Sequence, residues 1–244
     1  MRTRQFLILT LVIGMLLTAC AKDAAFQNSD EKLAKADELY ANKKYARAAE
    51  LYGEIYFERS SASTAYALMR QADSYFAINR FADARAAYEE FINTFPKHQD
   101  VSTAFFQSAL CMLEESLPAQ YDQGETVAAI ASFRRFIEKY PGDPRYEQAI
   151  EYIRKAQGKL IEKRYQNGYI SYKMKDYSAA LMYFKEVTDL GNTNDPDRMS
   201  LYYSAIICQR QNRQEEAKSF YQLLVDKYPQ SKEARKLKGL FSKQ

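Results

Sequence analysis

The chain has 244 residues, of which 47% are hydrophobic and 27% charged, a composition that indicates a globular protein and excludes a disordered one. Only 8 Gly and 6 Pro occur, which favours long helices joined by short turns over an all-β fold. The formal net charge is +4, and without the two arginines near the N-terminus 33 basic residues face 31 acidic ones, so we expect no nucleic-acid partner.

The first twenty residues have the order of parts of a bacterial lipoprotein signal sequence. Two arginines precede an apolar run over residues 6–17, which is too short to be a stable membrane span. Small residues directly before Cys20 resemble the lipobox, in which the peptide is cut before the Cys and the Cys is acylated. We predict a signal peptide over 1–19, lipidation of Cys20 and a polar tether over 20–28. The open alternatives are an uncleaved anchor and a signal peptide with an incidental Cys.

The residue after Cys20 bears on the location of the chain. By resemblance to Gram-negative lipoproteins, an Asp at that position tends to retain the protein at the inner membrane, and here it is Ala21. We therefore expect the outer membrane, with the chain on its periplasmic face and held by its lipid. Several acyl chains give a durable anchor where one gives a marginal one. Apart from this covalent lipid we expect no cofactor.

Five similar segments follow the tether. Each has an Ala three residues after an anchor position and an aromatic residue seven after it, and three segments also have a Pro fifteen after it. The spacings between anchors are 36, 45, 51 and 37 residues, two of them close to the period of ~34 residues of a tetratricopeptide (TPR) repeat. The anchors are Tyr45, Phe81, Thr126, Tyr177 and Gln214.

Two further positions support helical hairpins. A tiny side chain lies nine residues before the anchor, where it lets the two helices of a repeat cross closely, and the Pro ends the second helix. We predict an all-α TPR-like solenoid of about five repeats, because one hairpin cannot bury its apolar face. The tiny residues are Ala36, Ala72, Ala109 (shifted by an insertion), Gly168 and Ala205, and the prolines are Pro96, Pro141 and Pro229.

One helix is expected to be much longer than the rest. From Pro144 to about Lys175 only two glycines weaken the helical pattern, and Asp143 is a suitable N-cap. Such a helix would be ~45 Å long and would join repeats three and four. We predict repeats 1–3 over 29–142, and the linking helix with repeats 4–5 over 143–244.

The stacked first helices of such repeats line a concave face. The stripe one residue beyond the tiny residue, at helical spacing, is expected to face that groove. Exposed aromatic residues are typical anchors of protein interfaces, although each of them could instead pack against the next repeat. The candidate partner-binding groove consists of Tyr40, Tyr66, Met69, Phe76, Phe106, Tyr165, Tyr169, Tyr172 and Tyr202.

Catalytic and metal signatures are absent from the sequence. His98 is the only histidine, and its place just after Pro96 favours a cap or loop role over a His–carboxylate site. No Cys/His cluster has metal-ligand spacing, and no phosphate-binding glycine loop or nucleophile elbow occurs. We expect a protein that is not an enzyme. Cys111 and Cys208 could form a disulfide in an oxidising compartment, but their apolar helical settings favour two buried free thiols.

A lipobox followed by five TPR-like repeats resembles the BamD (ComL-type) lipoproteins of the outer-membrane β-barrel assembly machine. The resemblance covers almost the whole mature chain, although repeat one lacks the Tyr-Pro ending of the family. Its specific points are Phe95-Pro96-Lys97-His98, Ala128-Ala129 with Phe133-Arg134-Arg135-Phe136, and Tyr172-Lys173-Met174-Lys175.

The resemblance implies two protein partners. The C-terminal repeats would bind a POTRA domain of the barrel-forming BamA subunit, and the N-terminal repeats would receive unfolded outer-membrane proteins. An extended peptide with alternate aromatic side chains would suit an aromatic groove. The alternative is another TPR envelope lipoprotein, either a pilus-secretin pilotin or a coordinator that contacts peptidoglycan.

Overall fold

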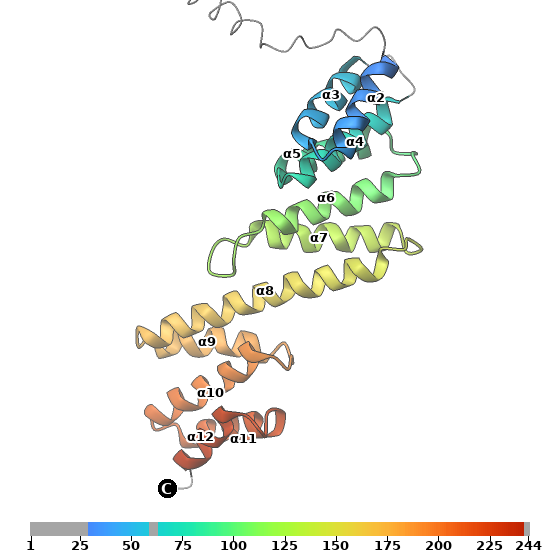
Figure 1. The fold of residues 1–244 in the computed structure, drawn as a ribbon. Coiled ribbons are helices and arrows are strands. Elements are labelled where there is room, and N and C mark those ends of the chain that lie inside the picture. Colours follow the sequence, from blue (N-terminus) through green and yellow to red (C-terminus); the bar gives the residue numbers. More distant parts are fainter. Residues whose placement is uncertain (1–28, 59–62, 242–244) are drawn as a thin grey trace, which may run out of the picture. The chain divides into compact units, whose positions relative to one another are not determined.

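The computed structural model describes residues 29–58 and 63–241, which form eleven α-helices and no strand (Figure 1). The predicted signal peptide, Cys20 and most of the tether lie outside the described residues. Ten helices form five hairpins, and the last one follows them. The helices are α2 (Ser29–Ala41), α3 (Tyr45–Glu58), α4 (Thr64–Ala77), α5 (Phe81–Thr94), α6 (Val101–Glu115), α7 (Gly124–Lys139), α8 (Tyr146–Lys173), α9 (Tyr177–Thr188), α10 (Asp195–Arg210), α11 (Gln214–Lys227) and α12 (Lys232–Phe241).

The chain divides into two compact units at Gln71/Ala72, inside α4. The division expected from the sequence at residues 142/143 stays a prediction. α8 packs on α7 and also on α9 and α10. These contacts make α5 to α12 one continuous unit. The N-terminal unit has its own core of apolar side chains from α2, α3 and the start of α4.

The repeat pattern predicts which residues lie where the helices cross. The Ala three residues after each anchor is fully buried in all five repeats, and so are the tiny residues of the first helices. At Gly168 the two helices approach closely, since a Cβ atom there would lie 2.7 Å from the ring of Phe184 in α9. The buried alanines are Ala48, Ala84, Ala129, Ala180 and Ala217 after the anchors, and Ala36, Ala72, Ala109 and Ala205 before them.

Four hairpins share one turn. The residue two positions before the anchor has a positive φ of 59° to 64°, which reverses the chain in a tight turn between the two helices. Two of these residues are Asn, which adopts positive φ more readily than most residues. The other two are Lys, a residue type from which a positive φ could not be predicted. Repeat three has a longer connection instead. The turn residues are Lys43, Asn79, Lys175 and Asn212.

The prolines mark helix ends as predicted. α5, α7 and α11 each end two residues before a Pro, and the residue between has non-helical backbone angles, for example φ −123° and ψ 54° at Phe95. A proline disfavours helical angles in the residue before it, so the position of these helix ends follows directly from the sequence.

α8 is the long helix expected from the sequence, with 28 residues. It begins two residues later than predicted, at Tyr146, because Asp143 does not cap the helix. The Asp143 carboxylate instead accepts bonds from Arg145, from Nε at 2.8 Å and from Nη2 at 2.7 Å. This ion pair holds the pKa of the Asp143 carboxyl well below its usual range. Figure 1 shows α8 passing along both α7 and α9.

Candidate partner-binding surfaces

The N-terminal unit carries a partly exposed cluster of aromatic and charged side chains around Asp37. The hydroxyls of Tyr52 and Tyr66 both donate to Asp37 Oδ1, at 2.6 Å and 3.0 Å. Tyr52 is fully buried, whereas Tyr66 is 44% exposed. The guanidinium of Arg70 lies 3.6 Å from the centre of the Tyr40 ring, a cation–π contact. The cluster therefore places the exposed ring of Tyr66 beside the half-buried guanidinium of Arg70, 5.9 Å from the ring centre.

Two of these tyrosines are held in their protonated form. Burial raises the pKa of Tyr66, and the hydrogen bond to the Asp37 carboxylate raises it further. The same two causes, in the same order, raise the pKa of Tyr52. The Asp37 carboxylate thus accepts two hydroxyl donors, and this fixes the orientation of the Tyr66 ring at the surface.

The remaining candidates before α6 are less exposed. Met69, in the N-terminal unit, is half-buried. Phe76, in the C-terminal unit, is also half-buried, and its ring lies 5.3 Å from that of Phe81 in an edge-to-face arrangement. These side chains could contribute to a surface only with part of their area.

Phe106 does not lie on a surface, so its expected groove position is wrong. It is 4% exposed and forms the centre of the core between α6, α7 and α8, with ring centres of Phe133 and Phe136 at 5.5 Å and 5.3 Å. The reason is helical spacing. Phe106 lies three residues before the tiny Ala109, and residues three or four apart share one face of a helix, so both face α7.

Tyrosines gather where α8, α9 and α10 meet. The rings of Tyr165, Tyr169 and Tyr172 follow one another along α8, with centres 6.2 Å and 6.3 Å apart and nearly parallel planes. Tyr203 of α10 packs against two of them, 4.8 Å from Tyr172 and 5.3 Å from Tyr169. All four are half-buried, so part of each side chain stays at the surface while the rest packs within the repeat.

Charge and burial shape the edge of this tyrosine cluster. Burial raises the pKa of Tyr165 to about 12, and it also raises the pKa of Tyr203. The exposed Arg210 lies 5.4 Å from the Tyr172 ring centre and donates to the Tyr177 hydroxyl at 3.4 Å. Tyr202, the last candidate, is half-buried and packs on the apolar core of α10 to α12. The rings of the cluster are themselves uncharged, with Arg210 at one edge and the charges of Glu162 and Arg198 close to Tyr165.

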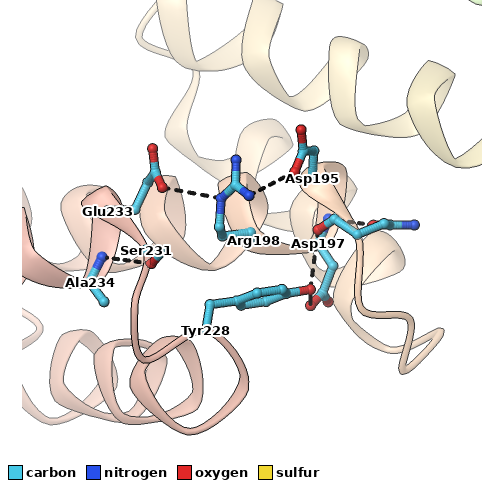
Figure 2. Close-up of polar contacts among 8 residues, drawn as sticks. Asp195, Asp197, Arg198, Tyr228, Ser231, Glu233 and Ala234 are labelled. Carbon is cyan, nitrogen blue, oxygen red and sulfur yellow. Dashed lines mark hydrogen bonds and ion pairs between the residues drawn. The ribbon is translucent and has the colours of Figure 1, made fainter.

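A buried carboxylate ties α10 to the end of α11 (Figure 2). Asp197 is fully buried, and its Oδ2 accepts from the Tyr228 hydroxyl at 2.7 Å and from Lys227 Nζ at 2.8 Å. The same two donors reach the loop before α10, where Lys227 bonds the carbonyl of Asn192 and Tyr228 that of Asn194. The loop between α9 and α10 is therefore held in place by two side chains at the end of α11.

The last helix is fixed by a second ion pair. The Arg198 Nε lies 3.1 Å from Oε2 of Glu233, which is nearly buried, and Arg198 Nη1 lies 2.7 Å from Asp195 (Figure 2). Ser231 caps α12 by accepting from the Ala234 amide at 3.1 Å. Sequence reasoning missed both networks. The one signal available was Asn194 before Asp195-Pro196, a cap followed by Pro in the first turn.

Both described cysteines are buried free thiols, as the sequence favoured. Burial raises the pKa of Cys111 to about 12 and also raises the pKa of Cys208, so neither is a nucleophile near neutral pH. His98 lies in the loop after α5, where its Nδ1 accepts from the Asp100 amide at 3.2 Å. Among residues 29–58 and 63–241 no group of three or more His, Cys, Asp or Glu is placed to hold a metal ion. None of the described helices is long and apolar enough to cross a membrane.

Paired helices with buried small residues at their crossings define a helical-repeat protein of the TPR type, and the predicted fold class is confirmed. A tetratricopeptide-repeat model matches residues 199–231. A second family model, YfiO, described as outer membrane lipoprotein, matches residues 19–205, which is most of the chain. The chain belongs to this family of outer membrane lipoproteins, and the resemblance drawn from the sequence is confirmed.

The relatives are outer membrane protein assembly factors. BamD of Rickettsia prowazekii (strain Madrid E) is 28% identical over 240 residues, which are 95% of this chain and 94% of that protein. BamD of Caulobacter vibrioides is 30% identical over 63 residues, 26% of this chain and 21% of the relative. The chain is thus a BamD-like member of an outer-membrane assembly-factor family.

Solved TPR structures resemble the chain over most of its length. The TPR2AB domain of yeast Sti1, in complex with a Hsp90 peptide, is 13% identical and covers 84% of this chain and 80% of its own, with a TM-score of 0.46. PilF of Pseudomonas aeruginosa is 17% identical and covers 87% of this chain and 82% of its own, with a TM-score of 0.38.

Proposed function

We propose that the chain is a lipid-anchored scaffold on the periplasmic face of the outer membrane, where it binds a barrel-forming BamA-like subunit and unfolded outer-membrane proteins. The observation that carries the proposal is the family match over residues 19–205, together with a BamD relative that aligns along almost the whole chain. The anchor is the lipid on Cys20, which lies outside the described residues.

The C-terminal unit is proposed to bind the POTRA domain of the barrel-forming subunit through the tyrosine cluster of α8 and α10. This assignment is supported by the half-buried Tyr165, Tyr169 and Tyr172 and by the exposed Arg210 at their edge. Tyrosine and arginine are enriched among residues that dominate binding energy at protein interfaces, because they bury a large area and still reach a polar partner. Tyr202 extends the same surface.

The N-terminal unit is proposed to receive unfolded outer-membrane proteins. The support is the surface around Asp37, where Tyr66 and the Arg70–Tyr40 pair are presented together, with Met69 beside them in the sequence. An extended peptide with aromatic side chains could stack on these rings, and its terminal carboxylate would suit the guanidinium of Arg70.

The test is affinity isolation of the tagged chain from mild-detergent membranes, with mass spectrometry of the proteins retained. A POTRA-containing barrel protein in near-equal amount is the expected result. Its absence, with secretin or peptidoglycan-associated proteins in its place, would support a pilotin or an envelope coordinator and contradict the proposal.

Two matched pairs of variants separate the proposed surfaces. Arg210→Glu should reduce the retained barrel protein, whereas Arg235→Glu, an exposed arginine on α12, should not. Tyr66→Ala should reduce crosslinking to unfolded barrel substrates, whereas Phe57→Ala, an 82% exposed aromatic in the same unit, should not. Equal effects within either pair would show that the surface is assigned wrongly.

A further inference from the structure

The C-terminal unit contains a groove of about 700 Å³ that the surfaces above do not include. It lies between α7, the middle of α8 and the loop that joins α9 to α10. Binding pockets for specific ligands span about 300–1,000 Å³, so the groove has the size of a binding site. Its walls belong to one compact unit, so its shape does not depend on the rest of the chain.

The floor of the groove is aliphatic. Ile130 of α7 and Ile161 of α8 form its base and are almost buried. Val127 and Leu190 stand at its rim, 55% and 51% exposed. Large aliphatic side chains that stay exposed around a hollow with an aliphatic base favour a partner with a complementary apolar side chain.

The walls of the groove carry positive charge from arginine side chains. Arg134 of α7 and Arg154 of α8 line the groove and are exposed, and within residues 29–58 and 63–241 neither forms an ion pair. A third, Arg164, is 3.4 Å from Glu186. No Asp or Glu lines the groove. The arginine fork matches the two oxygens of a carboxylate, so the groove favours an acidic ligand.

The third wall offers amide groups and is held rigidly. Asn192 and Asn194 line the groove from the loop before α10. Their carbonyls are bonded by Lys227 and Tyr228, the donors that also hold the buried Asp197. A wall fixed before binding loses little conformational entropy when a ligand arrives, which raises affinity.

The length of the groove limits the ligand. The α8 residues that line it run from Arg154 to Arg164, which at 1.5 Å per residue is ~15 Å. An extended peptide advances ~3.3 Å per residue, so the groove matches four or five residues of extended chain. An extended peptide also leaves its backbone groups free for the asparagine amides of the third wall, whereas a helix has already used them.

We propose that this groove binds a short extended segment of a partner protein, in which acidic side chains flank one or more aliphatic ones. The aliphatic side chain would lie on Ile130 and Ile161, and the flanking carboxylates would pair with Arg134 and Arg154. The proposal does not rest on the function proposed above, because it needs neither the barrel-forming subunit nor a substrate to be present.

The experiment is a fluorescence-polarisation titration of the full chain, in mild detergent, against labelled pentapeptides. The set has Glu or Asp at both ends and Leu, Ile or Val between them, and its matched controls have Lys at both ends. We expect acidic peptides to bind and the lysine peptides not to. The double variant Arg134→Gln/Arg154→Gln should raise the dissociation constant about tenfold, which is ~1.4 kcal/mol.

A charge-matched control separates the effect of the groove arginines from the effect of the net charge of the chain. Lys155→Gln/Arg235→Gln removes two exposed positive charges that do not line the groove, and it should leave the dissociation constant unchanged. Leu190→Ser, at an exposed rim position, should weaken binding without affecting the helical circular dichroism signal.

Three outcomes would overturn the proposal. The first is that no acidic peptide binds. The second is that both double variants weaken binding equally, which would show that the peptides respond to net charge alone. The third is displacement of the peptide by phosphatidylglycerol doped into the micelles, with the same loss in Arg134→Gln/Arg154→Gln, which would assign the groove to an anionic lipid. The affinity isolation is separate, since loss of the barrel subunit there would leave these titrations unchanged.

Discussion

Helix α8 contains two glycines in opposite surroundings, and the same substitution at each should have opposite effects. A Cβ atom at Gly168 would lie 2.7 Å and 2.8 Å from two ring atoms of Phe184 and 3.1 Å from Cβ of Tyr183. Phe184 is fully buried, so its ring has no room to retreat. At Gly158 a Cβ atom would have no neighbour within 4 Å.

The magnitudes follow from two competing effects. Replacing Gly by Ala inside a helix stabilises it by about 0.8–1 kcal/mol, because Ala loses less backbone entropy. Forcing a methyl group into a packed interface costs about 1–3 kcal/mol. Gly158→Ala should therefore raise the free energy of unfolding by nearly 1 kcal/mol, and Gly168→Ala should lower it by about 1 kcal/mol, a difference of about 2 kcal/mol.

Urea unfolding followed by circular dichroism at a helical wavelength measures this difference. The two variants share a helix, a substitution and a gain in propensity, so the comparison isolates the crossing of α8 and α9. The double variant should show the sum of the two effects, since the sites are ten residues apart. If Gly168→Ala stabilises the chain as much as Gly158→Ala does, the close crossing described at Gly168 is refuted.

Three further predictions concern groups described above. Tyr228→Phe removes the hydroxyl bonded to a fully buried carboxylate and should lower the free energy of unfolding by about 1–3 kcal/mol, as measured in urea. Folding lowers the pKa of Asp143, so the carboxylate stabilises the chain above the unfolded pKa of about 4, and this stabilisation is lost as the pH falls toward the folded pKa. The difference in the free energy of unfolding between wild type and Asp143→Asn should therefore shrink below about pH 4. A difference that stays constant with pH would contradict this. In a Cys20→Ser background, Cys111 and Cys208 should react with a thiol reagent only after urea is added, and labelling of the folded chain would show that they are accessible.

Features that depend on local spacing were predictable from the sequence. The tiny residues and the alanines after the anchors are found at helix crossings because they recur at fixed distances within each hairpin. The helix ends before Pro96, Pro141 and Pro229 follow from the conformational restriction of a single residue.

Features that depend on which of several groups a side chain bonds or packs against could not be predicted from the sequence. Asp143 has the composition of a cap, but Arg145 two residues later takes its carboxylate, and α8 begins later than predicted. In repeat three the insertion displaced the register, and Phe106 was assigned to the surface although it shares a helical face with Ala109.

The groove and the tyrosine cluster differ in how far the sequence reveals them. Tyr165, Tyr169 and Tyr172 recur at three- and four-residue spacing, so a shared face of one helix could be predicted. The groove combines α7, α8 and a loop that follows them only after another helix, and its shape depends on bonds from Lys227 to that loop. Such long-range placement leaves no periodic signal in a single sequence.

Because α8 is unbroken, the number of residues between its two proposed binding faces sets the angle between them. The groove contacts the helix around Gly158 and the tyrosine cluster begins at Tyr165, with no turn between them. Each added or deleted residue in that stretch would rotate one face against the other by about 100°, whereas seven residues, about two full turns, would nearly restore the angle. Relatives in which both faces are used should therefore vary in length here by about seven or eleven residues, if they vary at all, and single-residue insertions should collect in the loops.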